Sequence, residues 1–163
     1  MPIRIMGTGS FLPEKNVSNT DLEKYVDTNQ TVNASKLANN NLVDVCNSLE
    51  SALDNMTNSE VEAAKKALEM AGKEAIDVEL IVLATVTPDY YTPSAACQVQ
   101  AELGADKAIA FDVNAACSGF VFALNVAKMY IETGFVKNAL IIGAETLSKI
   151  LDWNDRGTCV LFG

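Results

Sequence analysis

The 163-residue sequence contains no histidine. Histidine is the commonest general base and a frequent metal ligand near neutral pH, so its absence removes the usual partner of a catalytic nucleophile. The cysteines also lack the C-x-x-C spacing of many metal sites; they are Cys46, Cys97, Cys117 and Cys159. With neither histidine nor paired cysteines, we expect no metal site in this chain.

Basic residues are scarce as well, since 12 Lys and Arg stand against 21 Asp and Glu, for a formal net charge of −9. Phosphate binding needs a basic face, so we expect no nucleic acid partner, and an acidic carrier protein would need a local basic patch. No apolar run reaches the length of a membrane span, and residues 1–7 are too short and broken for a signal peptide. We therefore predict no membrane association and a cytoplasmic protein with reduced thiols.

Apolar runs alternate with helical patterns along the chain, in which 49% of the residues are hydrophobic. The runs predict strands over residues 3–7, 81–86, 108–113, 140–144 and 158–163. The helical patterns predict helices over residues 60–71, 93–103 and 117–133, each ended by a glycine. This alternation is typical of an α/β fold, with a mixed, mostly parallel five-stranded sheet and helices on both faces.

Residues 28–59 differ in character, because they are polar and rich in asparagine. Asparagine disfavours helix interiors, since its side chain competes for backbone hydrogen bonds. We predict a loop-rich excursion here, with a helix near residues 42–53. Ser59 is then the predicted cap of the helix over residues 60–71, with Glu62 close to the acidic position of a capping box.

Cys117 lies where the predicted strand over residues 108–113 gives way to a helix. A thiol at a helix N-terminus faces unpaired backbone N–H groups and the positive end of the helix dipole, which favour the thiolate. Cys117 is therefore a candidate nucleophile, although a free cysteine is more often a buried structural residue. We interpret the other three cysteines as structural.

The helix after Cys117 is apolar nearly all round, whereas a surface helix would show a single apolar stripe. We expect it to be buried between two layers, one of them supplied by a second domain or a second subunit. The sequence also stops directly after an apolar run at residues 160–162. We expect that the natural protein continues or that this chain is a fragment.

Four segments together resemble 3-oxoacyl-acyl carrier protein synthase III, a family of the thiolase superfamily. They are residues 7–13 with 19–28, residues 87–100, residues 111–120 (FDVNAACSGF) and residues 155–163. Their order and spacing match the N-terminal half of that family only. The resemblance implies a thiolase-like domain over residues 1–163, with the C-terminal domain absent and residues 29–59 as an atypical region.

By this resemblance, Cys117 accepts an acyl group from a coenzyme A thioester, and the carbanion from decarboxylating malonyl-acyl carrier protein then attacks that group. The implied activity is an acyltransferase that initiates fatty acid biosynthesis by Claisen condensation, with coenzyme A thioester as a substrate and no separate cofactor. Arg156 and Thr28 correspond to substrate-binding positions, Arg156 near the coenzyme A nucleotide. Thr92 corresponds to the residue that reaches from one subunit of a homodimer into the primer pocket of the other. Its small size suggests that branched primers fit.

The chain also departs from the family's pattern. The family's catalytic histidine and asparagine belong to the C-terminal half, which leaves the backbone N–H of Cys117 as one remaining oxyanion donor. Residues 29–59 lack the tryptophan, arginine and Thr-Gly-Ile turn that the family uses to contact coenzyme A and the carrier protein. We therefore expect the condensation to be incomplete in this chain alone. One alternative is a catalytically inactive half that serves as a pairing or structural module, and another is a thiolase-like relative with a different acyl chemistry.

Three further side-chain features have two readings each. Tyr90 and Tyr91 either contact another subunit or cover the core locally, and aromatic loops favour contact. Asp155 and Arg156 form either a surface ion pair of little energetic consequence or part of a coenzyme A site. Trp153 is interpreted as a packing residue rather than a stacking platform.

Overall fold

The computed structural model describes residues 4–11, 56–152, 155 and 157. The chain divides into two compact units. The first comprises residues 1–12 and 55–145, and the second comprises residues 13–54 and 146–163. The described part of the second unit contains one short 3₁₀ helix, η4 (Leu147–Ile150). The predicted excursion over residues 28–59 lies almost wholly outside the described residues, and the predicted strand over residues 158–163 lies outside them entirely. The prediction of one domain over residues 1–163 stays a prediction.

The first unit is built on a parallel sheet of β1 (Leu80–Ala84), β2 (Ile109–Val113) and β3 (Leu140–Gly143). The strand order is β2-β1-β3, and β1 pairs in parallel with both neighbours. Every residue of the central strand β1 is buried. A strand covered on both faces has no solvent side, which explains why its sequence is a continuous apolar run.

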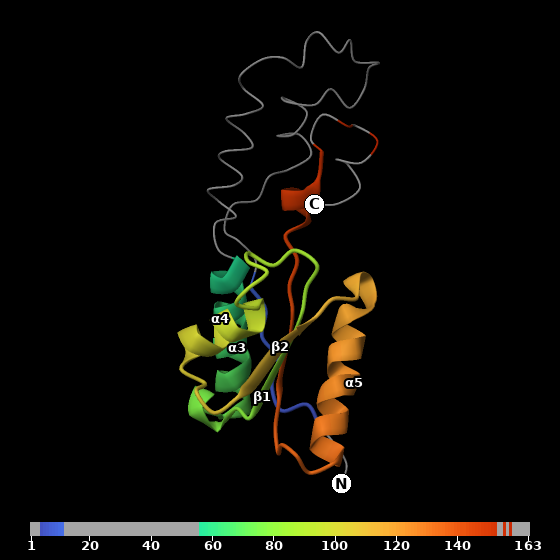
Figure 1. Cartoon of the computed structure of the whole chain (residues 1–163). Coiled ribbons are helices and arrows are strands. Elements are labelled where there is room, and N and C mark those ends of the chain that lie inside the picture. Colours follow the sequence, from blue (N-terminus) through green and yellow to red (C-terminus); the bar gives the residue numbers. More distant parts are fainter. Residues whose placement is uncertain (1–3, 12–55, 153–154, 156, 158–163) are drawn as a thin grey trace. The chain divides into compact units, whose positions relative to one another are not determined.

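Helices cover both faces of this sheet (Figure 1). On one face, Ile81 and Leu83 of β1 share a core with α3 (Met56–Ala71) and α4 (Ala95–Leu103). On the other face, Leu80 and Val82 share a core with α5 (Gly119–Glu132). The predicted α/β fold with helices on both faces is therefore confirmed, and the described residues contain three of its strands.

The N-terminal segment departs from the prediction of a strand over residues 3–7. Residues 4–11 have no regular secondary structure. Gly7 and Gly9 lie directly against the backbone of α3, where a Cβ atom on Gly7 would meet the carbonyl oxygen of Ala67 and one on Gly9 that of Ala63. The two glycines thus permit a close approach to the helix that a residue with a side chain would prevent.

The start of α3 also differs from the prediction that Ser59 caps it, because Ser59 lies inside this helix. The first turn is instead capped from a distant loop: Asp89 Oδ2 accepts hydrogen bonds from the Thr57 backbone N–H at 3.2 Å and from Thr57 Oγ1 at 3.1 Å. A carboxylate at a helix N-terminus satisfies unpaired donors and complements the helix dipole. The predicted end is confirmed, since Gly72 follows α3 with a φ of 61°.

The remaining boundaries follow local signals. Ser94 caps α4 by accepting from the Cys97 N–H, and Gly104 ends that helix with a φ of 71°. Gly134, with a φ of 76°, follows α5. The short 3₁₀ helix η2 (Ala75–Asp77) leads into β1. None of the helices within residues 4–11, 56–152, 155 and 157 combines the length and apolarity needed to cross a bilayer.

Candidate active site

Cys117 lies on the connection that leaves the carboxyl end of β2. After Val113 the chain turns through η3 (Ala116–Ser118) and enters α5 at Gly119. Cys117 is exposed. The predicted strand–turn–helix arrangement is confirmed, but α5 begins two residues later than expected, and Cys117 occupies a tight 3₁₀ turn just before it. The crevice outside the carboxyl ends of parallel strands is the usual place for ligands in α/β folds.

The turn that carries Cys117 is strained at the preceding residue. Ala116 has a φ of 46°, a left-handed conformation that costs a residue with a Cβ atom about 1–2 kcal/mol. The turn is closed by a hydrogen bond of 3.1 Å from the Ser118 N–H to the Ala115 carbonyl oxygen. Strained residues of this kind cluster at functional sites, where the surrounding structure holds them.

The first turn of α5 packs closely on the strand ends. A Cβ atom on Gly119 would lie 3.1 Å from the Cβ of Ala84, the last residue of β1. A Cβ atom on Gly143, the last residue of β3, would lie 3.1 Å from a ring carbon of Phe120. Glycine at both contacts lets the start of the helix lie against the sheet, which holds the residues just after Cys117 over the ends of β1 and β3.

Asp112 links β2 to the neighbouring helix α4. Its carboxylate accepts hydrogen bonds from the backbone N–H groups of Ala95 at 2.9 Å and Ala96 at 2.8 Å, in the first turn of α4. The interpretation of the sequence assigned no role to Asp112. A signal for it was present, since an aspartate within an otherwise apolar strand needs hydrogen-bonding partners when it is partly buried.

Glu145 is a second acidic residue that the sequence interpretation missed. It follows β3, and its carboxylate accepts from the Val86 N–H at 3.0 and 3.2 Å and from Thr87 Oγ1 at 2.8 Å. Thr85 Oγ1 is a longer contact at 3.4 Å. The carboxylate therefore joins the segments that leave the carboxyl ends of β1 and β3.

Of the other predicted site residues, the structure describes only Thr92. It is exposed, on the connection between β1 and α4, and its peptide bond to Pro93 is cis. Thr92 and Cys117 thus both lie on connections that leave the carboxyl edge of the sheet. Thr28, Arg156 and Trp153 lie outside the described residues.

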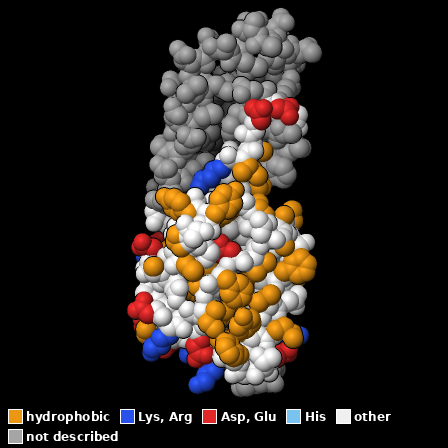
Figure 2. Space-filling model, in the orientation of Figure 1, with side chains coloured by type: hydrophobic (Ala, Val, Ile, Leu, Met, Phe, Trp, Pro, Cys, Tyr) orange, Lys and Arg blue, Asp and Glu red, His pale blue; other side chains and the backbone are white. Residues whose placement is uncertain are grey.

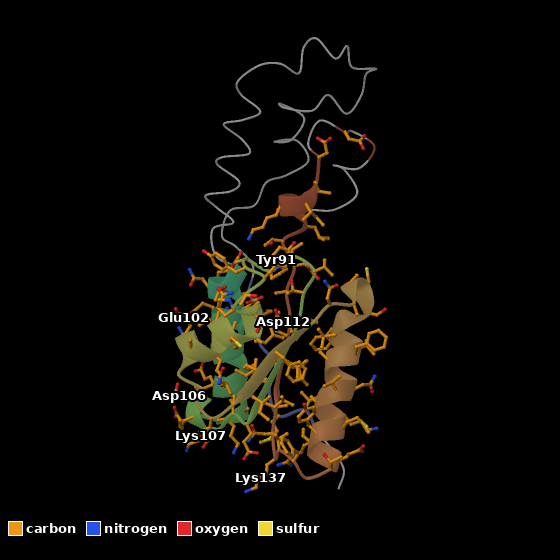
Figure 3. All side chains as sticks on the ribbon, viewed as in Figure 1. Tyr91, Glu102, Asp106, Lys107, Asp112 and Lys137 are labelled. Carbon is orange, nitrogen blue, oxygen red and sulfur yellow. The ribbon has the colours of Figure 1, made fainter. Side chains whose placement is uncertain are left out.

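Tyr90 and Tyr91 precede Thr92 and are 63% and 97% exposed. Figure 3 shows Tyr91 on the connections at one end of the sheet. Exposure of this extent contradicts the reading in which both rings cover the core locally. Cys97 is partly buried, with its thiol 3.6 Å from the carbonyl oxygen of Ala110, in line with a structural role.

Comparisons with known proteins show which family this chain is similar to. A family model described as 3-oxoacyl-[acyl-carrier-protein (ACP)] synthase III matches residues 111–163, which include Cys117. The chain is 47% identical over 161 residues to beta-ketoacyl-[acyl-carrier-protein] synthase III of Clostridium acetobutylicum, covering 99% of this chain and 48% of that protein. The corresponding protein of Caldanaerobacter subterraneus is 48% identical over 161 residues, covering 98% of this chain and 46% of that protein.

A solved structure gives the same result. The crystal structure of 3-oxoacyl-[acyl-carrier-protein] synthase III from Aquifex aeolicus matches with a TM-score of 0.80 and 41% identity, covering 98% of this chain and 50% of that one. The chain therefore spans about half the length of the relatives that it matches. Nearly the whole of this chain therefore matches about half of a protein of the 3-oxoacyl-acyl carrier protein synthase III family, and its fold is thiolase-like.

Proposed function

We propose that this chain is the acyl-accepting half of a β-ketoacyl-acyl carrier protein synthase III. The observation that carries the proposal is the exposed thiol of Cys117 on a strained turn between β2 and α5, within the segment that matches the family model. An exposed thiol on a turn before a helix is accessible to an electrophile.

In the first step, the Cys117 thiolate attacks the carbonyl carbon of a short acyl-coenzyme A. A bond forms between Sγ and the acyl carbon, the carbon–sulfur bond to coenzyme A breaks, and coenzyme A leaves as a thiolate that takes up a proton. The backbone N–H of Cys117 is one donor to the tetrahedral oxyanion. Splitting the overall reaction through an acyl-cysteine replaces one difficult step with two easier ones.

In the second step, malonyl-acyl carrier protein loses carbon dioxide and its carbanion attacks the acyl-cysteine. A carbon–carbon bond forms, the thioester bond to Sγ breaks, and Cys117 leaves as a thiolate. This step needs groups that stabilise the carbanion and the thioester oxygen. In the family these are a histidine and an asparagine of the C-terminal half, and this chain contains no histidine. We therefore propose the complete condensation only for a longer protein, or for an assembly in which another chain supplies these groups.

The remaining roles are proposed on the family resemblance. Arg156 binds coenzyme A near its nucleotide and Thr28 binds substrate, with no cofactor besides coenzyme A thioester as substrate. Thr92 enters the primer pocket of the other subunit in a homodimer. The exposed position of Thr92, beside two exposed tyrosines, supports a contact outside its own subunit. We further propose a cytoplasmic protein.

Comparing acylation by acetyl- and isobutyryl-coenzyme A tests the primer pocket. Poor use of the branched primer would contradict the proposal that branched primers fit this pocket.

Incubating the chain with acetyl-coenzyme A and measuring its intact mass tests the first step. We expect one acetyl group on Cys117, located by peptide mass spectrometry, and none on the Cys117→Ala variant. Cys97→Ala is the matched control and should still be acetylated. The absence of any adduct, under conditions that label an intact synthase, would contradict the proposal.

That negative result would favour a second candidate function, an inactive thiolase-like half that acts as a pairing or structural module. One observation supports it: five large apolar side chains of α5 are exposed in the described structure, as a surface for another layer would be. They are Phe120, Val121, Phe122, Leu124 and Met129. The sequence-based expectation of such a layer remains a prediction.

A further inference from the structure

Glu145 is linked through hydrogen bonds to the end of β2, the strand that precedes Cys117. Its carboxylate accepts from Val86 N–H and Thr87 Oγ1, which follow the end of β1. In the same segment, the Thr85 N–H donates to the carbonyl oxygen of Val113 at 3.2 Å. Val113 is the last residue of β2 and lies four residues before Cys117. The Glu145 carboxylate thus holds the segment that follows β1, and this segment holds the last residue of β2 in place.

A second set of contacts links the residue before Glu145 to the start of α5, which follows Cys117. The N–H of the preceding residue, Ala144, donates to the carbonyl oxygen of Ala84 at 3.1 Å. Ala84 is the residue against which Gly119 packs at the start of α5. The residues before and after Cys117 are therefore both supported by the strand ends that Glu145 holds together.

The supported turn contains Ala116, whose φ of 46° is strained for a residue with a Cβ atom. A strained conformation persists only where the surrounding structure determines it. We propose that Glu145 is a positioning residue, which keeps Ala116 left-handed and so holds the Cys117 thiol at the start of α5. This inference rests on the proposed role of Cys117 as the nucleophile.

A double-mutant cycle on the full chain separates this role from general stabilisation. Glu145→Ala removes the carboxylate, and Ala116→Gly removes the strain, because glycine adopts positive φ readily. The readout is the alkylation rate of Cys117 by iodoacetamide at neutral pH, measured by peptide mass spectrometry relative to Cys97. Glu102→Ala is the matched control, because Glu102 is an exposed glutamate on α4. Hydrogen exchange at the Val86 amide reports whether the segment after β1 has been released.

We expect Glu145→Ala to slow alkylation of Cys117 roughly tenfold, which corresponds to about 1.4 kcal/mol. The released turn relaxes at Ala116 and moves the thiol out of its exposed position just before α5. In the Ala116→Gly background the same substitution should change the rate less than about twofold, since effects that pass through one shared backbone element are not additive. Glu102→Ala should have no effect.

Equal falls in both backgrounds would overturn the proposal, because the effect would then not pass through Ala116. A wild-type alkylation rate in Glu145→Ala, together with faster exchange at Val86, would overturn it as well. If Glu145→Ala does not fold, Glu145→Gln decides the same cycle, because the amide keeps the size of the side chain and one acceptor oxygen. Iodoacetamide needs no acyl-coenzyme A site, so this cycle can succeed or fail independently of acetylation.

Discussion

Asp112 and Ala96 join β2 to the helix beside it: Asp112 Oδ1 accepts a hydrogen bond from the Ala96 N–H at 2.8 Å. The second oxygen accepts from the Ala95 N–H at 2.9 Å, so both oxygens of one carboxylate face the start of α4. The donors at a helix N-terminus have no partner within the helix, and a carboxylate complements the dipole there.

Asp112→Asn should therefore destabilise the protein, although the two side chains have nearly the same shape. The amide keeps one acceptor oxygen, but its NH₂ group faces a backbone donor that then loses its partner. The expected cost is about 1–3 kcal/mol, read as a lower urea midpoint with an unchanged slope. Asp106→Asn, at an exposed position before β2, should leave the midpoint unchanged. Equal midpoints for wild type and Asp112→Asn would show that the bidentate contact contributes little.

The sequence was sufficient for the parts of the fold that local chemistry determines. The largely apolar runs of the described strands, the start of α4 near Ser94 and the glycines after α3, α4 and α5 each have a local cause, and each was predicted to within a few residues. Predictions failed where a distant residue decides the outcome. Asp89 caps α3 from 32 residues away, so local capping rules pointed to Ser59 instead. Gly7 contacts α3 rather than ending a strand.

The candidate site divides in the same way. Cys117 was predicted from a local strand-to-helix transition and the motif around it. Its supports were not, because Glu145 is about 60 residues away in sequence from the backbone that it binds. A sequence shows that an acid follows a strand, but only the register of the parallel sheet brings that acid to the end of a neighbouring strand.

The buried residues of α5 are small, namely Gly119, Ala123 and Ala127, and this leads to a packing prediction. Ala123 is fully buried in the core that includes Leu80 and Val82 of β1. Ala123→Leu should lower the stability by about 1–3 kcal/mol, because added methylenes in a packed core force neighbours to move. Val121→Leu, at an exposed position on the same helix, should change stability by less than about 0.5 kcal/mol. Similar urea midpoints for both variants would contradict the observed orientation of α5.

The outer face of α5 is apolar and exposed, with Phe120 50% and Phe122 52% accessible. Figure 2 shows hydrophobic side chains gathered over this region. Apolar surface in water binds apolar dyes, so the chain should enhance anilinonaphthalene sulfonate fluorescence. Phe122→Glu should reduce that fluorescence, with stability changed by less than about 0.5 kcal/mol. Ile76→Glu, a substitution at an exposed site on η2, should leave the fluorescence unchanged. Equal fluorescence for wild type and Phe122→Glu would contradict a dye site on this face.

Glu62 and Lys65, one turn apart on α3, give a pH-dependent prediction. Lys65 Nζ lies 2.8 Å from Glu62 Oε1, and this hydrogen bond, together with the charge of the same ammonium group, holds the pKa of Glu62 below its usual range. Because the folded-state pKa is lowered, the pair stabilises the protein above the ordinary glutamate pKa of about 4.3 and loses that effect as pH falls through the folded value. Lys65→Met should raise the pKa of Glu62 toward the ordinary value, measured by carboxyl ¹³C NMR titration. Lys107→Met is the control at a distant exposed lysine. An unchanged Glu62 titration in Lys65→Met would contradict the pairing, and added salt should weaken the effect in the wild type because both side chains are exposed.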